Sequence, residues 1–221
     1  MHRFMPDSRD SDSQHPVLLQ PCNIQEPLDF SRLYATSKPV ELELGSGDGG
    51  FILHAATSNP DHNFLAVERL LGRLRKIERG GILRNLSNLR AVRIEISYLM
   101  RFLIPPSSIH AIHVYFPDPW PKKRHARHRL FRPQFTRWAA RVLEVGGTIY
   151  MRTDDVPYFD QLKHTFSGDP EFIPCETPPH LASFRTEFEQ QWNSMGIPTN
   201  YAAYQWHPIE SPQNNFTPQQ K

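Results

Sequence analysis

Short runs, in which residues are apolar or alternate between apolar and polar, follow one another along the chain with stretches in which apolar residues recur at helical spacing. The short runs are typical of strands and cover residues 40–44, 64–67, 89–94, 109–116 and 148–152. The longer stretches predict helices over residues 51–58, 71–84, 98–103 and 133–143. Strands that alternate with helices indicate a Rossmann-like α/β fold, in which helices cover both faces of a mostly parallel, twisted sheet.

The pattern weakens toward both ends of the chain. Residues 1–30 are rich in Asp, Ser, Pro and Gln and predict a flexible N-terminal arm. After residue 168 the chain becomes rich in proline, and the one late apolar run, residues 201–206, predicts an edge strand. We therefore expect a single domain over residues 31–208 and a flexible tail over residues 209–221.

The first predicted strand leads directly into a glycine-rich loop that contains Gly45 and Gly47. Glycines allow the backbone to approach a ligand closely, and a doubly wound sheet binds ligands beyond the carboxyl ends of its strands. Three later predicted strands are each followed by an acidic residue: Glu68, Glu95 and Asp118. Glu68 follows Gly45 by 23 residues, close to the ~20 residues typical of a carboxylate that binds ribose hydroxyls. The sequence thus predicts a nucleoside-containing cofactor at this edge of the sheet.

The identity of this cofactor depends on Glu43 and Asp48, because nicotinamide enzymes use a similar glycine loop. Glu43 lies two residues before Gly45, where a dinucleotide-binding strand is usually apolar. Its carboxylate suits the sulfonium and ammonium groups of S-adenosylmethionine and would repel a pyrophosphate, as would Asp48. The structural alternative is that Glu43 pairs with a nearby Lys or Arg. For Glu95 two roles stay open: the side chain binds the adenine amine, or it faces solvent.

The most informative stretch of the chain reads FPDPWPKKRHAR and covers residues 116–127. Its three prolines stiffen the loop around Asp118 and reduce the entropy lost in holding this carboxylate in place. Trp120 offers a stacking surface beside a basic run, a combination that is frequent in single-stranded nucleic-acid sites. For the basic run alone, a solvated surface loop is the alternative.

The net charge is only +2, but basic residues concentrate in the segments 69–101 and 122–132. The two cysteines, Cys22 and Cys175, match no metal or redox spacing, so we predict no metal site. Residues 1–20 are polar, so we expect no signal peptide, and no apolar run is long enough to predict a membrane span. These features predict a soluble, cytoplasmic protein with no membrane partner.

The run Pro-Asp-Pro-Trp-Pro-Lys-Lys-Arg-His, residues 117–125, resembles the hallmark of the bacterial tRNA (guanine-N7)-methyltransferase family. The likeness extends through residues 43–47, 66–68, 153–154 and 186–189, and so covers about residues 40–205. The proline-framed run is highly specific, whereas the glycine loop is only supportive. The resemblance implies the methyltransferase version of the Rossmann-like fold, with methyl transfer from S-adenosylmethionine to N7 of a guanine in the variable loop of tRNA.

By the same resemblance, the cofactor site includes Glu43, Glu68, Glu95 and Asp118, and Asp118 is also the catalytic residue beside the guanine. The residues implied in tRNA binding are Lys122, Asp154, Thr186, Glu187, Phe188 and Glu189. The chain departs from the family at two positions: Glu95 replaces the usual Asp, and Glu187 replaces a Lys. The protein is expected to bind tRNA as a monomer or homodimer.

Two other classes of function stay open. A nicotinamide-dependent oxidoreductase would use the same fold, but Tyr158 and Lys163 are five residues apart and do not form its usual Tyr-x-x-x-Lys pair. A non-catalytic RNA-binding protein would not need the three acids Glu43, Glu68 and Asp118 together. A methyltransferase that acts on proteins or small molecules is disfavoured by the basic run.

Overall fold

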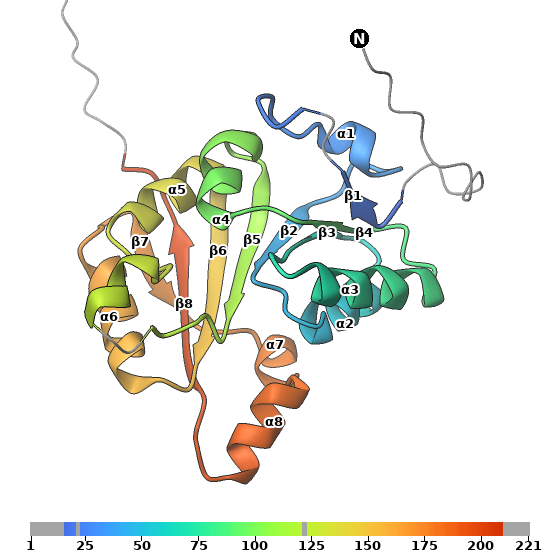
Figure 1. Ribbon diagram of the computed structural model, residues 1–221. Coiled ribbons are helices and arrows are strands. Elements are labelled where there is room, and N and C mark those ends of the chain that lie inside the picture. The colour runs from blue at the N-terminus through green and yellow to red at the C-terminus, as the bar shows by residue number, and fades with distance from the viewer. Residues whose placement is uncertain (1–15, 21–22, 121–122, 210–221) are drawn as a thin grey trace, which may run out of the picture.

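A computed structural model describes residues 16–20, 23–120 and 123–209, which fold around one sheet of eight strands (Figure 1). The strands are β1 (Leu18–Leu19), β2 (Val40–Leu44), β3 (Asn63–Val67), β4 (Leu89–Val92), β5 (Ile109–Tyr115), β6 (Leu143–Thr153), β7 (Phe172–Cys175) and β8 (Asn200–Trp206). They lie in the order β1-β4-β3-β2-β5-β6-β8-β7.

The strands from β1 to β6 pair in parallel, which confirms the predicted doubly wound sheet. The strand expected at an edge, β8, instead lies between β6 and β7 and pairs with both in antiparallel fashion. The prediction of an edge strand was wrong because β7, which contains Pro174, has too weak a pattern to be recognised in the sequence. Proline cannot donate to a ladder and is tolerated at an edge, and it is β7 that occupies the edge.

The longer helices are α2 (Gly50–Ser58), α3 (Leu71–Leu83), α5 (Gln134–Val142), α6 (Val156–Ser167) and α8 (Glu187–Ser194). Shorter helical segments are α1 (Phe30–Leu33), α4 (Ile96–Tyr98), a π-helical turn at Leu99–Leu103, a 3-10 turn at Lys123–His128 and α7 (Pro179–Ser183). The sequence pattern predicted α2, α3 and α5 to within one or two residues but missed α6, α7 and α8. No helix in the described part of the chain is long and apolar enough to cross a membrane.

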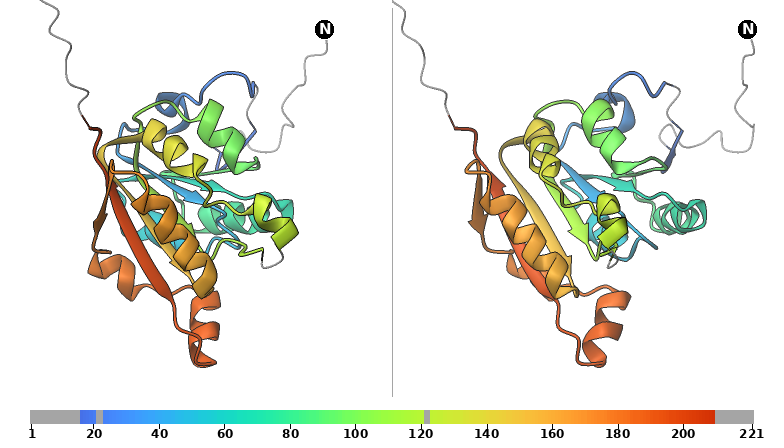
Figure 2. Two further views of the ribbon diagram at one scale, coloured as in Figure 1. Left: turned by 90° about the vertical axis from the view of Figure 1, so that its left-hand side faces the viewer. Right: turned by 60° about the vertical axis from the view of Figure 1, so that its left-hand side comes forward.

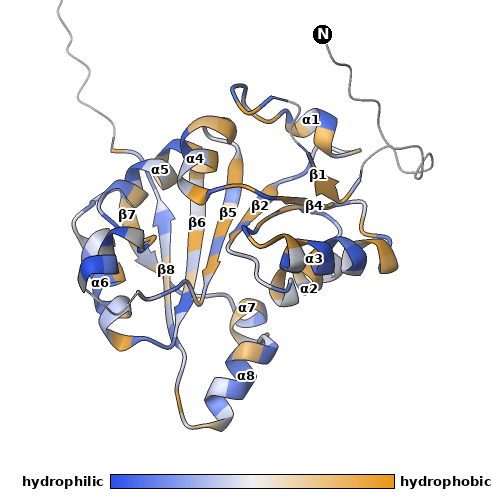
Figure 3. Cartoon of the chain, in the orientation of Figure 1, coloured by the Kyte–Doolittle hydropathy of each residue, from blue (hydrophilic) through white to orange (hydrophobic). Residues whose placement is uncertain are grey.

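Two apolar cores lie on opposite faces of the sheet, as alternate residues of β3 show. Leu65 and Val67 belong to one core, which also contains the buried residues of α5 and α6. Phe64 and Ala66 belong to the other core, which contains the buried residues of α2 and α3. The two further views show α5 and α6 together on one side of the sheet (Figure 2), and hydropathy colouring shows that its central strands are mainly hydrophobic (Figure 3). Helices therefore cover both faces, as predicted.

The start of the described chain corrects part of the expected flexible arm. Val17 is buried against α3, and its carbonyl accepts a hydrogen bond of 2.7 Å from the backbone of Ala91 on β4. Leu18 and Leu19 continue this pairing as β1. The apolar Val-Leu-Leu run therefore covers the edge of β4, within a segment whose overall composition suggested disorder. Residues 1–15 and the predicted tail beyond Ile209 lie outside the described residues.

Candidate functional site

The glycine loop after β2 is held by backbone hydrogen bonds at the end of the neighbouring strand. Gly45 and Gly47 adopt φ values of 83° and 55°, which a residue with a side chain rarely adopts. The backbone N–H of Gly45 donates to the carbonyl of Val67 at 2.9 Å. Glu68, the next residue, accepts from the N–H of Gly47 at 3.0 Å through one carboxylate oxygen and from Leu70 at 2.8 Å through the other. Glu68, the residue predicted to bind the ribose, therefore also holds the loop in place.

Glu43 lies beneath this loop and is almost completely buried. One of its carboxylate oxygens, Oε2, has no hydrogen-bond partner among the described residues. Burial raises the pKa of Glu43 to about 8, and the nearby charge of Glu68 adds to the rise, although Ser46 and Arg152 oppose it. A buried, unpaired carboxylate oxygen is costly by itself and is complementary to a cationic ligand. The site therefore fits the sulfonium and ammonium groups of S-adenosylmethionine.

Glu95 follows β4 and serves as the N-terminal cap of α4. Its carboxylate accepts hydrogen bonds from the hydroxyl of Ser97 at 2.6 Å and from the N–H of Tyr98 at 2.8 Å. Partial burial opposes the effect, but these hydrogen bonds lower the pKa of Glu95 below its usual value. The Glu95 side chain thus folds back onto its own helix, and a contact to adenine stays a prediction.

Asp118 lies in the loop after β5, between two residues with positive φ. Phe116 has φ 51° and Trp120 has φ 44°, values that are uncommon for residues other than glycine. The side chain of Asp118 is exposed and has no hydrogen bond or ion pair with any described residue. Its charge acts on Tyr158 of α6, which lies nearby. The loop therefore presents the carboxylate to an incoming molecule.

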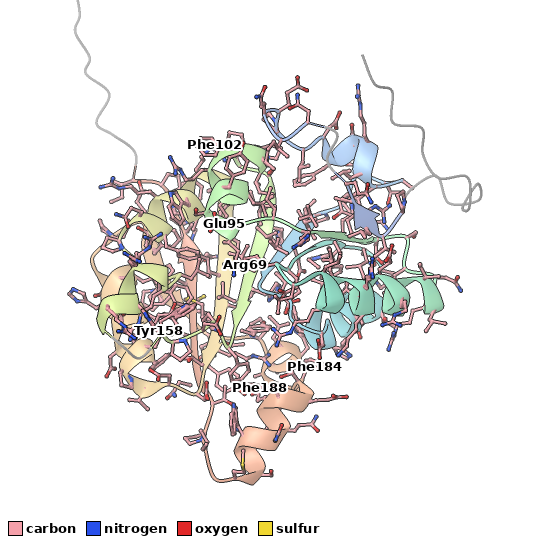
Figure 4. All side chains as sticks on the ribbon, viewed as in Figure 1. Arg69, Glu95, Phe102, Tyr158, Phe184 and Phe188 are labelled. Carbon is pink, nitrogen blue, oxygen red and sulfur yellow. The ribbon has the colours of Figure 1, made fainter. Side chains whose placement is uncertain are left out.

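The segment that carries α7 and α8 brings residues far away in the sequence to the same end of the sheet. The side chain of Thr186 lies 3.9 Å from the position that a Cβ would occupy on Gly50, at the start of α2. The ring of Phe188 packs against Phe116 with centroids 4.9 Å apart and stays 43% exposed. Phe184 and Phe188 lie at the end of the sheet where β5 and β6 terminate (Figure 4). The structure thus brings Thr186 to the start of α2 and Phe188 to the loop that carries Asp118.

Glu189 has a different setting from its neighbours in this segment. Its carboxylate is completely buried, 2.9 Å from Nη1 of the equally buried Arg152, and it also accepts from the hydroxyl of Tyr201 at 2.5 Å. Arg152 donates further hydrogen bonds to the backbone carbonyls of Leu181 and Phe184. This arrangement directs the Glu189 carboxylate into the interior. Its contact with tRNA stays a prediction, as does that of the exposed Glu187.

Two further residues, Asp154 and Lys122, were predicted to bind tRNA. Asp154 is half-buried at the carboxyl end of β6, next to Asp155, which caps α6 through a 2.7 Å hydrogen bond from Tyr158. Lys122 lies outside the described residues. The roles of Asp154 and Lys122 therefore stay predictions.

The sequence was compared with protein-family models and with known proteins. A family model described as "Putative methyltransferase" matches residues 37–201. A tRNA (guanine-N7)-methyltransferase of Rubrobacter xylanophilus is 31% identical over 173 residues, which make up 76% of this chain and 77% of the relative. The chain belongs to the tRNA (guanine-N7)-methyltransferase family. The resemblance seen in the proline-framed run is thereby confirmed.

Members of this family differ in length from the chain. A tRNA (guanine-N7)-methyltransferase of Streptomyces avermitilis is 35% identical over 150 residues, which cover 66% of this chain but 50% of the relative. The chain therefore spans about half the length of that relative. Among solved structures, the 16S rRNA methyltransferase KamB is similar with a TM-score of 0.61 at 20% identity, over 83% of this chain and 96% of KamB. That likeness supports the methyltransferase version of the Rossmann-like fold.

The structure also shows structural roles for three arginines that the sequence did not predict. Arg152 could have been noticed, because a charged residue within the predicted strand 148–152 needs a buried partner. Arg129 was counted only as part of a basic run, yet it makes hydrogen bonds inside the protein. Arg90 was also counted only as part of a basic segment, but it is buried and donates to the carbonyl of Leu33 at 2.6 Å. The positive charge available to an RNA is therefore smaller than the sequence predicted.

Proposed function

We propose that this protein transfers the methyl group of S-adenosylmethionine to N7 of a guanine in tRNA, in the variable loop, and forms 7-methylguanosine. The observation that carries the proposal is the buried, unpaired oxygen of Glu43 beneath the glycine loop. Burial raises the pKa of Glu43 to about 8, so this carboxyl gains its charge beside a cation and not beside an anion, which favours a cationic cofactor over the pyrophosphate of a nicotinamide cofactor. The family assignment and the exposed carboxylate of Asp118 at the same end of the sheet support the choice of reaction.

Each part of the cofactor has a matching group in the first half of the sheet. Glu43 would face the cationic end of the cofactor, and its pKa would fall when that charge arrives. Glu68 would accept from the ribose hydroxyls, because each carboxylate oxygen has two lone pairs and only one is used by Gly47 or Leu70. The loop glycines allow close approach of the ligand. When bound, S-adenosylmethionine supplies an electrophilic methyl group on a sulfonium.

The chemistry requires alignment more than proton transfer. Guanine N7 carries an in-plane lone pair and no proton, so it attacks the methyl carbon directly while the carbon–sulfur bond breaks. The nitrogen, carbon and sulfur must lie in line, and holding them so accounts for much of the rate. Positive charge then moves from sulfur to the purine ring. Asp118, presented by its rigid loop, would stabilise this developing charge.

The tRNA would be held by groups around the same loop. Arg124 and Arg127 are exposed on the 3-10 turn that follows the loop, and they would contact phosphates together with Lys122 and Lys123. The exposed ring of Phe188 would stack on a base near the target guanine. Thr186 and Asp154 would complete the contacts to the substrate.

The test is incubation of the protein with labelled S-adenosylmethionine and unmodified tRNA, followed by digestion and nucleoside analysis. We expect the label in 7-methylguanosine and nowhere else. Thermal unfolding with S-adenosylmethionine or with a nicotinamide cofactor provides a separate readout of cofactor choice, since a ligand at 100 times its Kd adds about 2.7 kcal/mol of stability. Label in another nucleoside, or stabilisation by the nicotinamide cofactor alone, would contradict the proposal.

A further inference from the structure

The loop that carries Asp118 is strained at both ends, and Asp118 does not hold it in place. Phe116 and Trp120 have positive φ, and the side chain of Asp118 makes no hydrogen bond to a described residue. Strained backbone persists only where surrounding contacts determine it, and such residues cluster at active sites. The position of the carboxylate must therefore be set by contacts to the backbone on either side.

The end of the loop at Phe116 is anchored by the sheet and by α8. Its N–H donates to the carbonyl of Arg152 at 2.8 Å, which continues the pairing of β5 with β6. Its ring packs against Phe188. These contacts fix where the loop begins; at its other end, the ring of Trp120 contacts the ring of His125.

The other end of the loop is anchored by Arg129. Nε of its guanidinium donates to the carbonyl of Pro119 at 2.6 Å, and Nη2 donates to the carbonyl of Trp120 at 3.3 Å. Nη1 donates to the side chain of Gln161 on α6. The guanidinium lies 5.4 Å from the ring centroid of Tyr158, also on α6. Arg129 therefore connects the two residues after Asp118 to a helix of the core.

Helix α6 is itself well fixed at this point. The hydroxyl of Tyr158 accepts from the N–H groups of Leu130 and Phe131 at 3.0 and 3.2 Å, and Gln161 donates to the carbonyl of Phe131 at 2.6 Å. The ring of Tyr158 is buried in the core. The partners of Arg129 are thus rigid, as a residue that transmits a position requires.

We propose that Arg129 is a positioning residue: it holds the backbone of Pro119 and Trp120 and thereby fixes the carboxylate of Asp118 for methyl transfer. The inference rests on the proposed function. The proposed role of Arg129 is structural and differs from the phosphate binding proposed for Arg124 and Arg127, since three of its five N–H donors are engaged within the protein. A planar fork that binds two carbonyls and a third acceptor is a task that Lys cannot perform.

The test compares Arg129→Lys with Arg141→Lys. Arg141 is a matched control because its guanidinium also donates to two backbone carbonyls, those of Met100 and Ile104, but in a different loop. We expect Arg129→Lys to lower kcat by about 10- to 100-fold, the scale of a small misplacement of a reacting group. The Kd values for S-adenosylmethionine and tRNA should stay within about 3-fold, because the charge is kept. Arg141→Lys should leave kcat unchanged.

The salt dependence of tRNA binding distinguishes this role from a phosphate contact. For a positioning residue, Arg129→Gln leaves the slope of log Kd against log salt unchanged. For a phosphate contact, the same variant weakens binding and reduces the slope by about 1. A reduced slope with normal kcat at saturating tRNA would overturn the proposal, and so would normal kcat in both Arg129 variants. Gln161→Ala, which removes the partner on α6, should lower kcat in the same direction as Arg129→Lys.

Hydrogen exchange keeps the inference testable if the protein proves to have another activity. The backbone amides of Phe116, Asp118 and Trp120 should exchange faster in Arg129→Lys than in the wild type or Arg141→Lys, whether or not tRNA is methylated. Faster exchange together with no methylation by the wild type would refute the proposed function but leave the anchoring by Arg129 intact. Equal exchange in all three proteins would refute the anchoring itself.

Discussion

The two halves of the sheet are stabilised in different ways. The first half comprises β2, β3, β4, α2 and α3, residues 40–92, and it is held by apolar packing and in-register backbone pairing. The second half comprises β5 to β8 and α5 to α8, residues 109–206, and its α7–α8 segment depends on the buried ion pair of Arg152 and Glu189. The first half thus rests on many weak contacts, whereas the α7–α8 segment of the second half relies on Arg152, one residue with several partners.

The largest expected effect comes from breaking that ion pair. Arg152→Met should lower the free energy of unfolding by about 3–5 kcal/mol, because it leaves the Glu189 carboxylate buried without its partner. The measurement is urea unfolding at neutral pH. The matched control is the double variant Arg152→Met/Glu189→Leu, which removes both charges and should lose less. A loss below about 1 kcal/mol in the single variant would contradict the importance of the pair.

Asp118 lies where the two halves meet, and its replacement should affect the reaction without affecting stability. Asp118→Ala should reduce turnover by at least ~100-fold, the usual scale for one preorganised electrostatic group. Because the side chain is exposed and makes no hydrogen bond to a described residue, the melting temperature should stay the same. Initial rates with saturating tRNA and a thermal melt provide the two measurements. Turnover near the wild-type value would remove Asp118 from the mechanism.

A third prediction concerns the pH dependence of stability, through Glu43. The folded state raises the pKa of Glu43 from 4.5 to about 8, so the folded protein binds this proton more tightly than the unfolded chain does. Stability from this group is therefore present below pH 4.5 and is lost as the pH rises toward 8, by at most about 1.4 kcal/mol per pH unit. Glu43→Gln should remove this slope between pH 5.5 and 7.5 in denaturant unfolding. An identical slope in both proteins would refute the raised pKa.

The smallest expected effect is on the surface of the first half. Asp48 is exposed and pairs with Lys76 at 3.0 Å and Arg73 at 3.7 Å. Asp48→Ala should cost about 0–1 kcal/mol, and less at high salt, because exposed ion pairs are screened by water and ions. Urea unfolding at low and high salt measures this. A loss as large as that of Arg152→Met would abolish the contrast between exposed and buried pairs.

The sequence predicted the first half of the sheet well because its signals are local. In residues 40–44 apolar residues alternate with Glu up to the glycine loop, and the strand has these bounds. Glu68 could be placed from its distance to Gly45 alone. The second half depends on contacts between distant segments: the burial of Glu189 follows from Arg152, and the central place of β8 follows from β7. Neither partner can be inferred from local spacing.

In the second half, α5 was predicted, whereas α6, α7 and α8 were missed. Helix α6 begins with Val156-Pro157 and α7 with Pro179, because proline is tolerated in the first turn of a helix. For α7 and α8, the content of proline after residue 168 had hidden the helical pattern. The placement of Thr186 and Phe188 beside Gly50 and Phe116 was implied only by family resemblance. It became a physical observation once the α7–α8 segment was seen to return to the strand ends.

The position of β8 has a consequence for how the chain is made. Among the described strands, β7 pairs only with β8, and β8 also covers one edge of β6. Of these three strands, β8 is synthesised last. During synthesis, the nascent chain must therefore carry an open edge on β6 for about as long as the translation of residues 154–206 takes, and open edges invite association with other chains. Rare codons in that stretch would prolong this exposure and lower the yield of native protein.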